Sequence, residues 1–310
     1  MRYVDFGGDA YDDREQVVSA IERACETDPR AALRLVAEYS SYWWSRGLQD
    51  EAAAAAERVL SMLGRTVPVG LDEEYLLAVL HGAASAEQEQ LELAEQIVLA
   101  TTGPFRYSVT VLLWSLVFGP FESASVVEEV LARNESGDAW TRAAVELCRG
   151  YPGLTTATPG EAEQALRTAL GRFRMLDDGW GMFLAVTALR QVVDEPLDIT
   201  SEAVELAEQL GLEEETGLLL CQRGDLYLRL GKLEDAHEDY SRALTLGESA
   251  DLAETAAAAR IGLARTARYG GNLAVAREYL ADVLADTDDE DARAEALHEL
   301  DAVEACEASA

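Results

Sequence analysis

The stretch GDLYLRLGKLEDAHEDYSRAL, residues 224–244, decides the fold of this 310-residue chain. Small and large residues recur in it at intervals that fit a helix-turn-helix unit of about 34 residues. Two antiparallel helices approach closely where their crossing points carry Gly or Ala, and aromatic rings fill the space beside those points. The stretch therefore predicts a tight helical hairpin that turns at the second glycine, where a positive φ is favourable. The recurring residues are Gly224, Tyr227, Gly231, Ala236, Tyr240 and Ala243.

These residues occupy the signature positions of the tetratricopeptide repeat (TPR), and the stretch resembles that family. The resemblance implies an all-α, right-handed superhelical solenoid of TPR-like helical hairpins. A single hairpin of this kind cannot bury its apolar face, so it has to stack on neighbours.

Weaker copies of the pattern fill the rest of the chain, with Gly47 and Gly271 aligned on Gly231. We predict a single TPR-like solenoid over residues 1–310: an N-terminal helix and cap in 1–31, about seven hairpins in 32–286 and a C-terminal capping helix in 287–310. Turns are expected where Gly, Pro, Asn and Asp gather. The expected turns lie at 64–70, 118–121, 134–138, 177–181, 194–198 and 246–249.

The charge of the chain limits its partners. Its 58 acidic and 25 basic residues give a net charge of −33, and Lys232 is the only lysine. Such a charge repels nucleic acids and anionic membranes, so we expect no direct contact with either. A salt-adapted host and a lysine-poor genome both fit this composition. With no leader pattern, and an apolar window at 107–121 too short to cross a bilayer, we expect a cytoplasmic protein.

Few residues in the sequence suggest catalysis. The four cysteines and three histidines are scattered, without metal-ligand spacing or a nucleophile and base motif, so no catalytic, metal or cofactor residues are predicted. The acidic runs 71–74 and 286–295 lack the pattern of a calcium loop and are interpreted as solvated helix ends. We therefore expect a non-catalytic binding module.

Four longer phrases resemble the C-terminal repeat region of actinobacterial antibiotic regulatory proteins (SARP) and of large ATP-binding LuxR-type transcriptional regulators. They include the segments Trp-Trp-Ser-Arg-Gly at 43–47 and Asp-Asp-Gly-Trp-Gly at 177–181. The resemblance implies a regulatory or sensory role in which the repeats receive a protein or small-molecule signal. The phrases lie at 32–52, 138–150, 166–189 and 262–284.

The chain departs from those regulators in two ways. It has no phosphate-binding loop, because Lys232 follows a helix stop and Leu233 stands where a hydroxyl residue is required. No basic helix-turn-helix precedes residue 32. ATP hydrolysis and promoter binding are therefore not carried over, and both a stand-alone repeat protein and an excised region of a larger regulator remain open.

The TPR resemblance implies that the first helices of the hairpins line a concave groove. Four of the mapped residues are arginines, which bind carboxylates in a bidentate manner and would hold an acidic peptide or ligand. In the alternative interpretation, these arginines pair with acids of adjacent hairpins. The candidate groove residues are Arg149, Thr187, Gln191, Cys221, Asp225, Arg229, Arg265, Arg268 and Tyr269.

The tryptophans suggest a second type of site. Trp43, Trp114 and Trp140 are expected in the core, whereas Trp44 points about 100° away from Trp43, so one of that pair should face a groove or the next hairpin. A small-molecule receptor could use the long turn 151–160 with Trp140 and Trp180. A biosynthetic enzyme on a helical-repeat scaffold, and a homodimer formed through end hairpins, are further alternatives.

Overall fold

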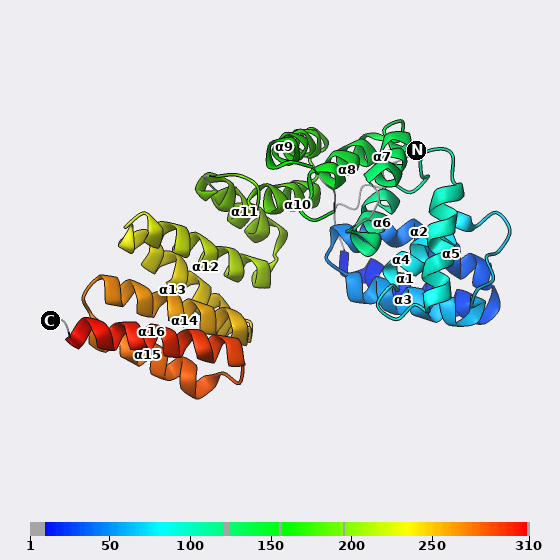
Figure 1. The fold of residues 1–310 in the computed structure, drawn as a ribbon. Helices are drawn as coiled ribbons and strands as arrows, with labels where there is room; N and C mark the ends of the chain where they lie inside the picture. Colours follow the sequence, from blue (N-terminus) through cyan, green and yellow to red (C-terminus); the bar gives the residue numbers. More distant parts are fainter. Residues whose placement is uncertain (1–9, 121–123, 155–156, 195, 309–310) are drawn as a thin grey trace. The chain divides into compact units, whose positions relative to one another are not determined.

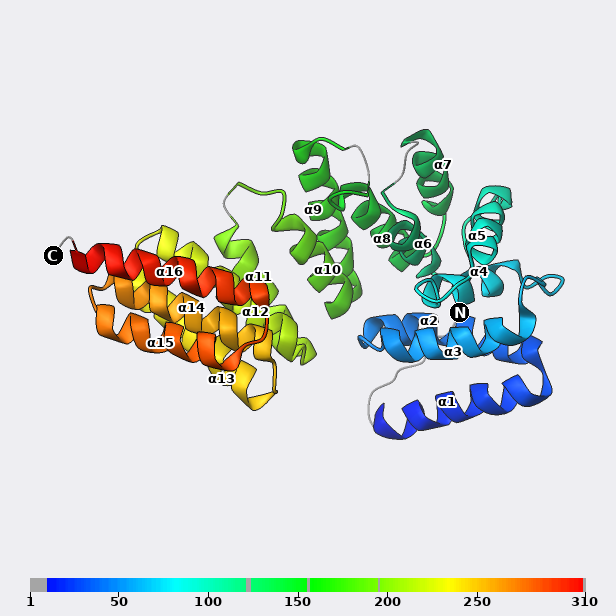
Figure 2. The ribbon, with the colours of Figure 1, turned by 60° about the horizontal axis from the view of Figure 1, so that its bottom comes forward.

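The computed structural model describes residues 10–120, 124–154, 157–194 and 196–308, and within these ranges it contains sixteen helices and no strand (Figures 1 and 2). The predicted all-α fold is confirmed. The chain divides into two compact units, Met1–Val192 and Val193–Ala310. A single solenoid through both units, and its handedness, stay predictions.

The N-terminal unit contains ten of the described helices, packed largely as antiparallel pairs (Figure 2). Its even-numbered helices form one layer, because each of α2, α4, α6 and α8 contacts the next even-numbered helix. The helices are α1 Ala10–Thr27, α2 Pro29–Ser45, α3 Gln49–Leu63, α4 Asp72–His81, α5 Gln88–Ala100, α6 Thr110–Phe118, α7 Ala124–Asn134, α8 Ala139–Gly150, α9 Pro159–Leu176 and α10 Gly179–Leu189.

The C-terminal unit repeats this plan. Its helices α12, α14 and α16 contact one another in turn and form one layer, and α11, α13 and α15 each pack against helices of that layer (Figure 1). Its bounds are α11 Leu197–Leu210, α12 Glu213–Arg229, α13 Leu233–Ser249, α14 Ala253–Tyr269, α15 Leu273–Asp286 and α16 Glu290–Ala308. None of the described helices is both long and apolar enough to span a membrane.

Tyr240 of α13 shows why the repeat pattern needs small residues. Its side chain is buried, and its ring lies against Gly224 of α12 and Gly262 of α14. A Cβ atom added at Gly224 would lie 2.7 Å from the ring, and one added at Gly262 would lie 2.2 Å from it. Both glycines are therefore required by the close approach of three successive helices.

The turns are mostly where the sequence places them. Gly47, Gly231 and Gly271 follow helices and have φ values of 68°, 71° and 79°, as their alignment predicts. The turn predicted at 246–249 is wrong, because α13 continues to Ser249. Gly247 is buried there, and an added Cβ would lie 2.8 Å from the backbone nitrogen of Ala256. Gly247 therefore allows the backbone of α14 to pack closely against α13, and it does not end α13.

The interpretation of residues 71–74 as a solvated helix end is also wrong. Glu74 is 3% exposed and accepts a 2.7 Å hydrogen bond from the guanidinium of Arg106. Glu73 accepts hydrogen bonds of 2.9 Å from the backbone N–H groups of Arg106 and Tyr107. These carboxylates fix the segment that leads into α6, which lies more than thirty residues further along the chain.

We predict that Gly262→Ala lowers the free energy of unfolding of the C-terminal unit by about 1–3 kcal/mol, because the added methyl overlaps the Tyr240 ring. Gly171→Ala is the control, since Gly171 lies inside α9 with nothing within 4 Å of an added Cβ. That variant should be more stable by about 0.5–1 kcal/mol. Urea unfolding followed by circular dichroism measures both, and a stable Gly262→Ala protein would contradict the packing argument.

Candidate binding sites

The wall formed by α12, α14 and α16 carries alternating charges. Asp225 of α12, Arg265 of α14 and Glu299 of α16 lie on successive helices. A guanidinium nitrogen of Arg265 is 3.7 Å from Asp225 Oδ1, and its Nε is 3.5 Å from Glu299 Oε2. Tyr240 also donates a 2.6 Å hydrogen bond to Asp225 Oδ1. The wall is therefore a continuous network within the protein.

Glu299 holds the network together at α16. It is 4% exposed, and its two carboxylate oxygens contact Arg265 and Arg268. The hydrogen bond from Arg268 to Glu299 raises the pKa of this guanidinium. Arg265 also binds Glu295. The neighbouring helix thus supplies the carboxylates that a partner was expected to supply.

The two other candidate arginines differ from each other. Arg149 of α8 forms ion pairs with Glu128 and Glu135 of the N-terminal unit. Arg229 is exposed at the end of α12, and its side chain forms no ion pair or hydrogen bond with any residue that the structure describes. Three of the four arginines therefore pair with acids of the chain, and binding of an acidic partner by any of them stays a prediction.

The remaining candidate residues vary in accessibility. Cys221 is buried, and burial raises the pKa of its thiol to about 12, so it is a poor nucleophile at neutral pH. Tyr269 is 61% exposed, and the guanidinium of Arg268 lies 4.5 Å from its ring centroid. Gln191 is exposed at the end of the N-terminal unit. Thr187 is partly buried, and its hydroxyl has no hydrogen-bond partner in the described part of the chain.

Trp44 of α2 and Trp180 of α10 meet inside the N-terminal unit. Their ring centroids are 6.4 Å apart with an interplanar angle of 89°, an edge-to-face arrangement. Trp43 is fully buried, whereas the ring of Trp44 contacts α10, which is not the next hairpin that we expected one of the adjacent tryptophans to face. The contact joins the segments 43–47 and 177–181, which carry much of the resemblance to the regulators. Both indole nitrogens are buried without a hydrogen-bond partner among the described residues.

Asp178 positions Trp180 at the start of α10. One of its carboxylate oxygens accepts a 2.6 Å hydrogen bond from the backbone N–H of Gly181, and the other accepts one of 2.9 Å from Trp140 Nε1. Phe173 packs where a side chain at Gly181 would lie. Trp140 is therefore held by Asp178, and of the two tryptophans predicted to line a pocket only Trp180 keeps a free indole N–H.

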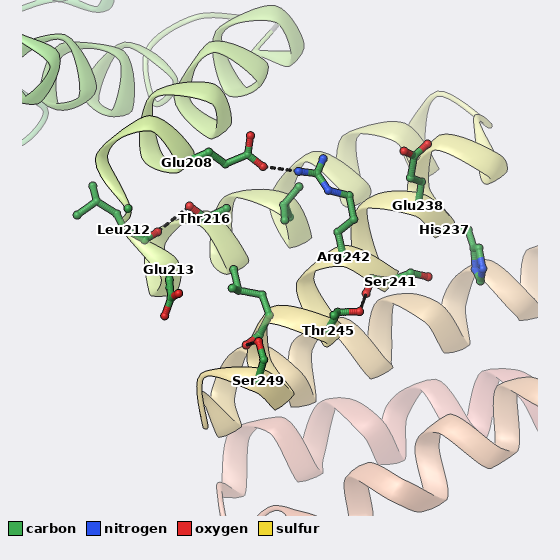
Figure 3. Close-up of a pocket in the computed structure, with 13 residues that line it drawn as sticks. Glu208, Leu212, Glu213, Thr216, His237, Glu238, Ser241, Arg242, Thr245 and Ser249 are labelled. Carbon is green, nitrogen blue, oxygen red and sulfur yellow. Dashed lines mark hydrogen bonds and ion pairs between the residues drawn. The ribbon is translucent and has the colours of Figure 1, made fainter.

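Residues of α11, α12 and α13 line a groove in the C-terminal unit (Figure 3). Its volume is about 820 Å³. Its apolar side chains are those of Leu212, Leu220 and Leu246, which we call the floor of the groove, and we call its polar and charged lining residues the rim. We call this hollow the α11–α13 groove; its other lining residues are Glu208, Gly211, Glu213, Thr216, His237, Glu238, Ser241, Arg242, Thr245 and Ser249.

Sequence reasoning did not find this groove. Its α13 side is a stripe of polar residues at helical spacing, from Glu238 through Arg242 and Thr245 to Ser249. Any solvated helix face shows the same pattern, so the sequence holds no signal that separates a groove wall from ordinary surface. Within the described residues, no three His, Cys, Asp or Glu side chains gather in a way that could hold a metal ion.

Comparisons with known proteins support the fold. No protein-family model matches the sequence, and no curated protein matches it. Among solved structures, the chain is similar to a signal transduction ATPase with numerous domains (STAND) that has a tetratricopeptide repeat sensor, from Pyrococcus horikoshii. The TM-score is 0.50 at 15% identity, over 75% of this chain and 40% of that chain. This chain thus matches less than half of the other protein's length, and the likeness shows a TPR-like helical-repeat fold.

We predict that Glu299→Gln lowers the free energy of unfolding of the C-terminal unit by about 1–3 kcal/mol, because two partly buried guanidinium groups lose their shared carboxylate. Glu304→Gln is the control, since Glu304 lies on the same helix, is exposed, and is 3.8 Å from Arg277. Its effect should stay within about 0.5 kcal/mol. Equal stability changes in the two variants, measured by urea unfolding, would show that the α12–α14–α16 network adds no stability.

Proposed function

We propose that this chain is a non-catalytic binding module that holds a segment of a partner protein in the α11–α13 groove. The observation that carries the proposal is the groove itself, with its volume of about 820 Å³ and its floor of leucine side chains. An apolar floor with a polar rim is the arrangement by which helical proteins bind the apolar face of a partner segment.

The length of the groove favours a polypeptide. Its α13 side extends from His237 to Ser249, and a rise of roughly 1.5 Å per residue makes that side about 18 Å long. Such a length accommodates about three turns of helix or five residues of extended chain.

We assign this binding to a regulatory or sensory role. Two observations support the assignment: the solved structure with a similar fold carries a TPR sensor, and the phrases at 43–47 and 177–181 resemble the repeat region of SARP and LuxR-type regulators. In this role the module would sequester a partner or pass on the signal of its binding.

Photo-crosslinking in the native host tests the proposal. A benzophenone amino acid at Thr245, in the groove, should yield a defined adduct with one partner protein, whereas the same group at Glu278, an exposed residue of α15, should not. Adding Ser241→Trp fills the groove and should remove the Thr245 adduct while the helical circular dichroism signal stays unchanged. Equal adducts from both positions, or an adduct that persists in the filled groove, would contradict the proposal.

A second candidate function is reception of a small molecule at the Trp44–Trp180 contact. The observation that favours it is a pair of buried donors without partners in the described residues: the indole nitrogens of Trp44 and Trp180. Buried donors are nearly always satisfied, and unsatisfied ones indicate a missing acceptor. The ligand would be an aromatic molecule with a carbonyl or carboxylate oxygen.

A thermal-shift screen of aromatic carboxylic acids tests this second function. A ligand should raise the melting temperature of the protein, because it binds the folded state alone. Trp44→Phe and Trp180→Phe keep an aromatic ring but remove the N–H donors, so each should weaken the ligand-induced shift. Trp114→Phe is the control, since Trp114 is a buried tryptophan of α6, a helix that carries neither Trp44 nor Trp180. A ligand shift that is the same in all three variants would place the site elsewhere.

A further inference from the structure

The rim of the α11–α13 groove carries more negative than positive charge. Glu208, Glu213 and Glu238 line it, and Arg242 is the only arginine or lysine among its lining residues. The guanidinium of Arg242 binds Glu208 across the groove, as Figure 3 shows. Its charge is therefore already matched, and the carboxylates of Glu213 and Glu238 form no ion pair with any described residue. An occupant of the groove meets two uncompensated negative charges.

The hydroxyl groups of the groove add acceptors. Thr216 donates its hydroxyl proton to the carbonyl of Leu212 at 2.6 Å, and Thr245 donates to the carbonyl of Ser241 at 2.9 Å. Ser249 does the same to Leu246. Because each of these protons is used within the helix, what these side chains offer a partner is the lone pairs of their oxygens. The groove thus accepts hydrogen bonds at many points and donates few.

The N-terminus of α12 is the feature of the groove that opposes a preference for a positively charged occupant. Its free backbone N–H groups and the helix dipole favour negative charge in an occupant. The first turn of α12 holds Glu213, Glu214 and Glu215, however, and a full carboxylate charge outweighs the dipole's half charge. The balance at this end of the groove stays negative.

We propose that the segment held in the α11–α13 groove is basic and amphipathic, with leucine-like side chains on the floor and lysine or arginine side chains on the rim. Lysine and arginine supply only donors, which is what a surface of acceptors requires. This inference rests on the proposed function and reverses the acidic partner that the arginines of the α12–α14–α16 wall suggest. A second copy of the chain is a poor occupant, since the chain is acidic and has one lysine.

Three synthetic helical peptides test the charge of the occupant. They share one leucine stripe and differ in their remaining positions, which are Lys, Gln or Glu. Fluorescence anisotropy with the full chain at low salt should give a dissociation constant for the Lys peptide at least about tenfold below that of the Gln peptide. The Glu peptide should bind least, and added salt should weaken binding of the Lys peptide.

Two double variants separate groove binding from general attraction to an acidic protein. Glu213→Gln with Glu238→Gln removes the unpaired rim carboxylates, and the affinity of the Lys peptide should fall about fivefold to tenfold. Glu205→Gln with Glu234→Gln changes the net charge equally, at exposed sites on α11 and α13 outside the groove. The affinity of that control should change less than about twofold.

The outcomes distinguish the two proposals. Equal loss in the two double variants would mean attraction to the whole surface and would overturn the basic occupant. If the Gln or Glu peptide binds as tightly as the Lys peptide, and Ser241→Trp removes that binding, the proposal of a basic occupant is contradicted. The proposal that the groove is a binding site is then supported. If Ser241→Trp changes the binding of none of the peptides, both the groove and its basic occupant are contradicted.

Discussion

The contact of one tyrosine ring with two glycines is the constraint on which the C-terminal unit depends. Tyr240 fixes the distance between α12, α13 and α14, because its ring fills the space that Gly224 and Gly262 leave. Its hydroxyl then binds Asp225, and Asp225 begins the series of charges that continues through Arg265 to α16. Packing and charge pairing in this unit therefore meet at the same side chain.

The sequence predicted the parts of the fold that depend on local spacing. The hairpin predicted from residues 224–244 and its turn at Gly231 follow from residues within one repeat, and the structure has both in α12 and α13. The errors concern contacts between repeats. Gly247 has the appearance of a helix stop, and only the backbone of Ala256 shows that it serves packing. Glu74 has the appearance of a surface acid until Arg106, from a later segment, covers it.

The candidate sites were less predictable for the same physical reason. Helical periodicity places Arg265 and Arg268 on one face of α14, but it does not indicate that Glu299 of α16 will occupy that face. The two segments that meet through Trp44 and Trp180 are each distinctive, yet spacing along the chain does not show that they touch. The α11–α13 groove depends on the separation of two helices, which side-chain pattern alone does not encode.

The use of arginine inside the protein determines what its surface can recognise. Arg149, Arg265 and Arg268 form ion pairs with acidic residues of the same chain. Because acidic residues outnumber basic ones, many carboxylates remain for contacts with a partner. Attraction between exposed charges amounts to about 1 kcal/mol at contact distance in water and fades within roughly 10 Å at moderate salt. Such attraction draws cationic segments to many places on this chain. Binding at one of these places in preference to the others requires burial of apolar side chains, which contributes about 25 cal/mol per Å². In the α11–α13 groove, Leu212, Leu220 and Leu246 provide that apolar surface beside the acidic rim.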